Sequence, residues 1–172
     1  MNKRTSFIFA VILIALAAFS RLIPHPMNFA PITAIALFGG VYFNGKFSPI
    51  LPLAALLISD LFLGVYDGIA WVYGSFLLVV VIGLAIRRYK SVPVVFGATI
   101  VSSLLFFLIT NFGVWQAGIF YTKDLIGLIE CYAAAIPFYR NSVMGDLFYV
   151  TVMFGVYELV MKYLPKVQST KA

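Results

Sequence analysis

Long apolar segments separated by short polar connections follow one another along the whole chain. An apolar helix needs about 20 residues to cross the hydrocarbon core of a bilayer. Five segments approach or exceed this length, and they cover residues 6–23, 49–66, 69–87, 92–115 and 141–164. A sixth, shorter segment, 31–44, begins with a proline, which the first turn of a helix tolerates. The pattern predicts an all-α, polytopic membrane protein whose six transmembrane helices form one domain over residues 1–172.

The segment 122–136 has the end signals of a further helix. Thr122 is a suitable N-cap residue, Asp124 would lie in the first turn, and Pro137 would end the helix. With about 15 residues this helix is too short to cross a bilayer. We therefore expect a short external helix that lies in the interface or is partly inserted.

Composition narrows the class of protein. The chain is 63% hydrophobic and only 10% charged, whereas a soluble domain is typically about 45–50% apolar and about 25% charged. This excludes a soluble globule, a disordered chain and a nucleic-acid-binding module, and the net charge of +6 fits basic loops on one face of a membrane. A single cysteine, Cys131, excludes an internal disulfide, and a single histidine excludes a histidine-rich metal or haem site. We expect no cofactor and no metal.

Basic residues predict the orientation of the chain. Because six is an even number of spans, both termini would lie on one side of the membrane. Nine basic residues fall on that side: Lys3, Arg4, Lys46, Arg87, Arg88, Lys90, Lys162, Lys166 and Lys171. Only Arg21, Lys123 and Arg140 fall on the other, so the positive-inside rule predicts cytoplasmic termini. In an alternative reading, the first basic residues and the apolar run 7–19 form a cleavable signal peptide.

Polar residues gather at the predicted outer ends of the spans. Charged groups within a bilayer are costly and mark functional sites by default. The candidate site residues that share this depth are Arg21, His25, Asn28, Asp60, Asn111, Trp115, Tyr132, Arg140, Asn141 and Asp146. The inner halves of the spans are almost wholly apolar, so the pattern predicts a pocket open to the outside rather than a channel.

These residues also have structural explanations. Arg21 with Asp60 or Asp146 would form an ion pair that joins two helices, and Trp115 and Tyr132 fit an aromatic belt at the membrane interface. Small residues along 30–40 fit either close internal helix packing or the docking of a partner subunit.

Enzyme motifs are scarce in this sequence. It contains no Gly-x-Ser-x-Gly elbow and no P-loop. Asp60 and Asp146 on separate spans would imitate a membrane aspartic protease, in which two close carboxylates share a proton. Val143, however, stands where a Gly-x-Gly-Asp pattern would have its first glycine. A protein without catalytic activity is the expectation, and a membrane enzyme is the less favoured reading.

Four motifs spread over nearly the whole chain resemble the signature of a bacterial family of small membrane proteins of unknown function. They are Asn28–Gly40, Ser59-Asp60, Thr110–Trp115 and Cys131–Phe138. That family is in turn similar, in size and topology, to the substrate-binding S components of energy-coupling factor transporters. This resemblance implies a multi-pass protein of the bacterial cytoplasmic (inner) membrane with an outward-facing solute site. One feature departs from it, because S components often carry an Ala-x-x-x-Ala docking pattern where this chain has Ser6-x-x-x-Ala10.

The interpretation that follows is an S-component-like transporter subunit that captures a small, planar or vitamin-like solute from outside. Its partners would be the lipid bilayer, the solute, and ATPase and transmembrane coupling subunits, but not nucleic acid. The expected polar contacts are Asp60, Asn111 and Asp146, with Arg21 and Arg140 as counter-charges and Trp115 and Tyr132 as stacking surfaces. The alternative is a structural or assembly subunit whose polar layer only holds helices together.

Overall fold

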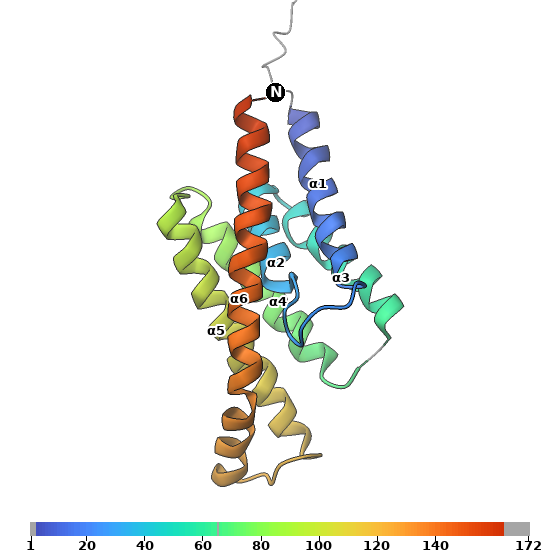
Figure 1. The fold of residues 1–172 in the computed structure, drawn as a ribbon, viewed down its shortest axis with the longest axis vertical. Helices are drawn as coiled ribbons and strands as arrows, with labels where there is room; N and C mark the ends of the chain where they lie inside the picture. Colours follow the sequence, from blue (N-terminus) through green and yellow to red (C-terminus); the bar gives the residue numbers. More distant parts are fainter. Residues whose placement is uncertain (1–2, 65, 164–172) are drawn as a thin grey trace, which may run out of the picture.

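The computed structural model describes residues 3–64 and 66–163, which form six α-helices and no strand. The helices are α1 (Lys3–Ser20), α2 (Ile32–Tyr42), α3 (Phe47–Leu63), α4 (Ile69–Ile86), α5 (Val92–Ala117) and α6 (Leu125–Tyr163) (Figure 1). Among them α4, α5 and α6 are long and apolar enough to cross a membrane, whereas α1, α2 and α3 are apolar but shorter. The prediction of an all-α chain is thus confirmed for the described residues.

The two ends of the bundle have different architectures. The start of α1 and the last turns of α6 lie at the same end, at the top of Figure 1. At the opposite end, the last turns of α5 and the first turns of α6 extend beyond the other helices (Figure 1). The polar residues discussed below lie between this projecting hairpin and the connection from α1 to α2.

α2 forms the centre of the bundle, and its residues Thr33–Val41 are all buried. It approaches α4 closely at Gly40 and Gly83. A Cβ atom on Gly40 would lie only 2.3 Å from the carbonyl oxygen of Val80 and 2.8 Å from the Cα atom of Gly83. Small residues allow two helix backbones to approach in this way. The small-residue pattern of segment 30–40 therefore serves internal packing.

α6 differs from the helices predicted for this part of the chain. The expected short helix over 122–136 and the expected span over 141–164 are in fact one helix of 39 residues. Pro137 lies inside this helix and does not end it. It lacks the N–H that would bond to the carbonyl oxygen of Ala133. The loss of one such bond is tolerated because α6 packs against α5 on both sides of the proline, through Tyr132 before it and Tyr139 after it.

The N-cap of α6 is Asp124 rather than the expected Thr122. The backbone N–H of Gly127 donates to Asp124 Oδ1 at 2.7 Å, which is the bond that an N-cap side chain makes. The Thr122 hydroxyl donates to the same oxygen at 3.0 Å. These hydrogen bonds, the one from Gly127 above all, hold the pKa of the Asp124 carboxyl below its ordinary value. Thr122 therefore supports the cap without being the cap.

Charged residues at the other end of the bundle bind across helices. Lys90, in the α4–α5 connection, forms an ion pair with Glu158 of α6. The Tyr42 hydroxyl at the end of α2 donates to the same carboxylate at 2.5 Å. Arg87 donates to the side chain of Asn44. These contacts gather the basic connections α2–α3 and α4–α5 near the last turns of α6.

Candidate functional site

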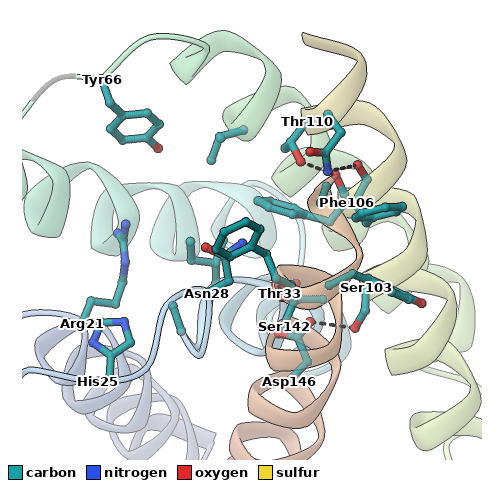
Figure 2. A pocket seen from close by; sticks show the side chains of 18 of the residues that line it. Arg21, His25, Asn28, Thr33, Tyr66, Ser103, Phe106, Thr110, Ser142 and Asp146 are labelled. Carbon is teal, nitrogen blue, oxygen red and sulfur yellow. Dashed lines mark hydrogen bonds between the residues drawn. The ribbon is translucent and has the colours of Figure 1, made fainter. Parts of the chain in front are cut away.

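A cavity of ≈ 430 Å³ lies beside the α1–α2 connection. The end of α3, the start of α4 and the facing stretches of α5 and α6 complete its wall. Its polar lining residues are Arg21, His25, Asn28, Thr33, Tyr66, Ser103, Thr110, Asn111, Tyr139, Ser142 and Asp146. Its apolar lining residues are Ala30, Ile32, Leu63, Val72, Phe106, Phe107, Ala135 and Phe138. Figure 2 shows these side chains converging from the connection on one side and from α5 and α6 on the other.

Asp146 is a buried carboxyl group on the wall of this cavity, and the residue is only 3% exposed. Its Oδ2 atom lies 2.6 Å from the Ser103 hydroxyl of α5, the bond drawn as a dashed line in Figure 2. Thr33 of α2 is a second hydroxyl neighbour of this carboxyl group and also lines the cavity. The ion pairs found among residues 3–64 and 66–163 use the carboxylates of Asp60 and Glu158. Asp146 therefore faces the cavity with hydroxyl neighbours and without a cation.

Asp60 on α3 is equally buried, but its charge is balanced within the protein and both of its carboxylate oxygens accept hydrogen bonds. Arg21 Nη2 donates to Asp60 Oδ1 at 2.7 Å, and the Tyr73 hydroxyl donates to Oδ2 at 3.0 Å. Arg21 also donates through Nη1 to the Ser59 hydroxyl. Of the two ion pairs that the sequence left open for Arg21, the structure contains the one with Asp60. Arg21 lines the cavity, and Asp60 lies behind it.

The rim of the cavity is formed by the α1–α2 connection. Asn28 has a φ of 61°, in the left-handed region that asparagine tolerates better than most residues. Asn141 of α6 donates from Nδ2 to the carbonyl oxygen of Met27 at 3.0 Å. His25 Nδ1 lies 2.7 Å from the carbonyl oxygen of Ile23. The connection is therefore held against α6, and its side chains are presented at the rim.

Aromatic rings form the wall on the side of α5 and α6. Phe106 and Phe107 come from α5, and Phe138 and Tyr139 come from α6. The rings of Phe107 and Tyr139 have their centroids 4.6 Å apart. Tyr132 packs edge-on against Phe107 from outside the cavity and donates its hydroxyl to the carbonyl oxygen of Leu108 at 2.6 Å. Tyr132 therefore supports the wall without lining it.

The candidate residues from the sequence divide into two groups. Those that line the cavity are Arg21, His25, Asn28, Asn111 and Asp146. Those that do not are Asp60, Trp115, Tyr132, Arg140 and Asn141. In the second group, the Trp115 indole N–H bonds to the carbonyl oxygen of Thr122 at 2.9 Å, and Arg140 is exposed beside a separate surface hollow. Geometry thus reduces the candidate list to residues that surround a single space.

Sequence reasoning missed the residues that complete this space. Ser103, Thr33, Phe106, Phe107 and Tyr139 were not among the candidates, although each lines the cavity. The adjacent serines in the middle of segment 92–115 were the available signal, because hydroxyl groups at that depth usually need a partner. The aromatic residues gave no signal, because a membrane segment contains many of them.

The fold and the site define a helical protein with membrane-type helices and a polar cavity large enough for a small molecule. The chain belongs to a family of unknown function, DUF6580, whose family model matches residues 1–168. This confirms the resemblance to a family of unknown function that the motifs indicated. No curated protein and no solved structure matches the chain.

Proposed function

We propose that this protein is a membrane-embedded solute-binding subunit of a transporter, which takes a small molecule from the external side into the cavity beside Asp146. The observation that carries the proposal is the cavity itself, which combines polar groups from several helices with an aromatic wall. Ligand pockets commonly enclose about 300–1,000 Å³ and place a few polar groups within a mostly apolar lining. The volume of ≈ 430 Å³ falls in this range.

The proposed topology has six membrane crossings with both termini in the cytoplasm. The start of α1 and the end of α6 lie at one end of the bundle, as two cytoplasmic termini would require (Figure 1). The same end holds the basic connections around Arg87 and Lys90, which the positive-inside rule assigns to the cytoplasm. α2 has 11 residues and rises about 16 Å, so it would cross the membrane only within a sheath of protein. The burial of all its residues from Thr33 to Val41 supports this arrangement.

The energy for transport would come from partner subunits. The sequence contains no P-loop, so a separate ATPase and a transmembrane coupling subunit would drive release of the solute inward. The argument for such partners is the similarity in size and topology to the S components of energy-coupling factor transporters. The proposed location is accordingly the bacterial cytoplasmic membrane.

The experiment that tests this proposal is mass spectrometry of small molecules released from the gently purified protein. Two variants of α6 make a matched pair. Ser142→Phe places a ring in the cavity, whereas Val152→Phe places the same ring at an exposed position of the same helix. We expect one solute from the wild type and from Val152→Phe, and none from Ser142→Phe.

Two results would contradict the proposal. If the same molecule is recovered from Ser142→Phe, it binds outside the cavity. If no molecule is recovered from an equal amount of purified wild-type protein, the proposal that the protein binds a solute is contradicted. Protein mass spectrometry of the same samples tests the partner subunits independently.

A structural or assembly subunit is the second candidate function. The buried pair of Arg21 and Asp60 favours it, because this pair joins the end of α1 to α3 and requires no ligand. The cavity distinguishes the two candidates, since a subunit that only locks helices together has no use for an open space beside Asp146.

A further inference from the structure

We propose that the solute carries a single positively charged nitrogen, and that the carboxylate of Asp146 is its counter-ion and exchanges a proton for it. This inference rests on the proposed function and names the chemical class that the cavity takes. It follows from three observations: the charges that face the cavity, the hydrogen bonds of Asp146, and the aromatic wall.

The charged groups that face the cavity leave one negative charge unbalanced. Arg21 is the only permanent cation among the described residues of the lining, and its charge is matched by Asp60 at 2.7 Å. His25 is exposed at the rim and has its Nδ1 atom at the carbonyl oxygen of Ile23. Asp146 is the remaining charged group of the lining.

Among the described residues, the helices packed around Asp146 supply no further counter-charge. α2, α4 and α5 contain no Asp, Glu, Lys, Arg or His at all. α1 also packs against α6, but its charged residues lie in its first turn, at the end of the bundle opposite the α5–α6 hairpin (Figure 1). The other charged residues of α6 lie outside the cavity lining: Glu130, Arg140, Glu158 and Lys162. The other titratable side chains that line the cavity are the phenols of Tyr66 and Tyr139. A buried ionised carboxylate without a counter-charge is unfavourable, so the group takes up either a proton or a cation.

The hydrogen bonds around Asp146 accommodate both of these states. The Ser103 Oγ atom lies 2.6 Å from Asp146 Oδ2 and 2.9 Å from the carbonyl oxygen of Thr99. When Asp146 carries a proton, it donates to Ser103 Oγ, and the serine hydroxyl donates to Thr99. When Asp146 is ionised, the serine hydroxyl turns and donates to the carboxylate. The change of state therefore needs the rotation of one hydroxyl hydrogen and no movement of heavier atoms.

The aromatic wall suits a cation bound at this carboxylate. Phe106 and Phe107 follow Ser103 by three and four residues, so they lie on the same face of α5. Tyr139 precedes Asp146 by seven residues, about two helical turns, so it lies on the same face of α6. The faces of aromatic rings attract cations, most strongly where water is excluded. A carboxylate beside such rings is the arrangement that recognises an organic ammonium group.

The exchange is balanced for each molecule of solute. The O–H bond of the Asp146 carboxylic acid breaks, the proton leaves to solvent through the cavity, and the ammonium group pairs with the carboxylate. One proton is released for each cation that binds, and the net charge of the site is unchanged.

The test uses three probes of one shape: 2-phenylethylammonium, the neutral 2-phenylethanol and the anionic 3-phenylpropionate. Their binding to the full-length protein in detergent is measured by isothermal titration calorimetry between about pH 5 and 8, where the amine stays protonated. The variant is Asp146→Asn, and the matched control is Asp67→Asn, which removes the same charge from an exposed connection.

For the wild type and Asp67→Asn, we expect the ammonium probe to bind at least tenfold more tightly than the alcohol. Toward the acid end of this pH range, the affinity of the protein for the ammonium probe falls by about tenfold per pH unit, because one proton competes with the probe for Asp146. In Asp146→Asn, the preference and the pH dependence are both lost. Titrations of the wild type in two buffers of different ionisation heat measure the proton release directly, so the test does not depend on the folding of a variant.

The outcomes separate this inference from the proposed function. If the alcohol or the carboxylate binds as well as the ammonium probe, or if no proton is released, the inference is overturned while the cavity remains a solute site. If none of the three probes binds the wild type, both the inference and the proposed site are overturned.

Discussion

Two aspartates of this protein begin the same tripeptide and have opposite environments. Asp60 and Asp146 are each followed by leucine and phenylalanine, and each is 3% exposed. Asp60 binds the guanidinium of Arg21 and the Tyr73 hydroxyl, so its charge is balanced within the protein. Among the described residues, the side-chain neighbours of Asp146 are the hydroxyl groups of Ser103 and Thr33.

The difference separates a structural role from a binding role. A buried charge with a counter-charge holds helices together, and removing one member leaves the other uncompensated. A buried carboxyl group beside an open cavity, without a counter-charge, does not hold helices together in this way and remains available to a ligand. Asp60→Asn and Asp146→Asn test this contrast directly, and Gly40→Ala and Asp124→Ala supply reference effects on stability that involve no buried charge.

Asp60→Asn should have the largest effect. It leaves the Arg21 guanidinium buried, at 6% exposure, without its counter-charge. We expect the free energy of unfolding to fall by about 3–5 kcal/mol, as measured by SDS titration in mixed micelles with circular dichroism. The double substitution Arg21→Met with Asp60→Leu should recover most of this loss. If Asp60→Asn alone is as stable as the wild type, the pair of Arg21 and Asp60 does not hold the helices together.

Gly40→Ala calibrates that loss with a change of packing and no change of charge. The new methyl group would meet the backbone of Val80 at 2.3 Å, which a side-chain movement cannot relieve. We expect a loss of about 1–3 kcal/mol that does not depend on salt or pH. Gly97→Ala is the control, because nothing lies within 4 Å of its Cβ position, and it should gain up to about 1 kcal/mol from helix propensity. Equal effects at the two glycines would contradict the close α2–α4 contact.

Asp146→Asn should change the free energy of unfolding by less than about 1 kcal/mol, since no buried counter-charge is left behind. The amide keeps the size of the carboxyl group and can still bond to Ser103. The same SDS titration, run beside Asp60→Asn, measures the contrast directly. A loss as large as that of Asp60→Asn would make both aspartates structural and remove the distinction between them.

Asp124→Ala should have the smallest effect, confined to the first turn of α6. Hydrogen bonds lower the pKa of this exposed carboxyl in the folded protein. Its contribution to stability is therefore present above the unfolded-state pKa of about 3.9 and is lost as pH falls through the lower folded-state pKa.

Amide hydrogen exchange at Gly127 should be faster in Asp124→Ala than in the wild type at neutral pH. The two should converge once acid has protonated the carboxyl. Asp67→Ala, which removes an exposed charge elsewhere, should leave this exchange unchanged. A difference that persists in strong acid would show that the cap does not depend on the carboxylate.

The helices themselves were largely predictable, because apolar segments leave little alternative to helix in a chain of this composition. The continuity of α6 through Pro137 was not predictable, since a proline ends a helix or lies within it according to what packs against both sides. The N-cap was missed by two positions for a related reason. Thr122 and Asp124 are both good capping residues, and only the backbone geometry decides which of them receives the N–H of Gly127.

The site was predictable as a level along the apolar segments but not as a set of neighbours. Charges are rare enough in these segments that Arg21, Asp60 and Asp146 stood out. Ser103 and Phe107 did not, because their residue types are common in membrane helices. Tyr132 and Asn141 lay at the right level yet contact the cavity wall from outside or hold its rim.

The sequence by itself determined the class of this protein, the positions of its helices and the end at which its polar groups gather. These properties depend on composition and on hydrophobic patterns along the chain. The tertiary structure alone decided which carboxyl group is neutralised and which is left facing a cavity. An aspartate in the same tripeptide acquires its role from residues more than thirty positions away, Arg21 for Asp60 and Ser103 for Asp146, and only folding brings such residues together.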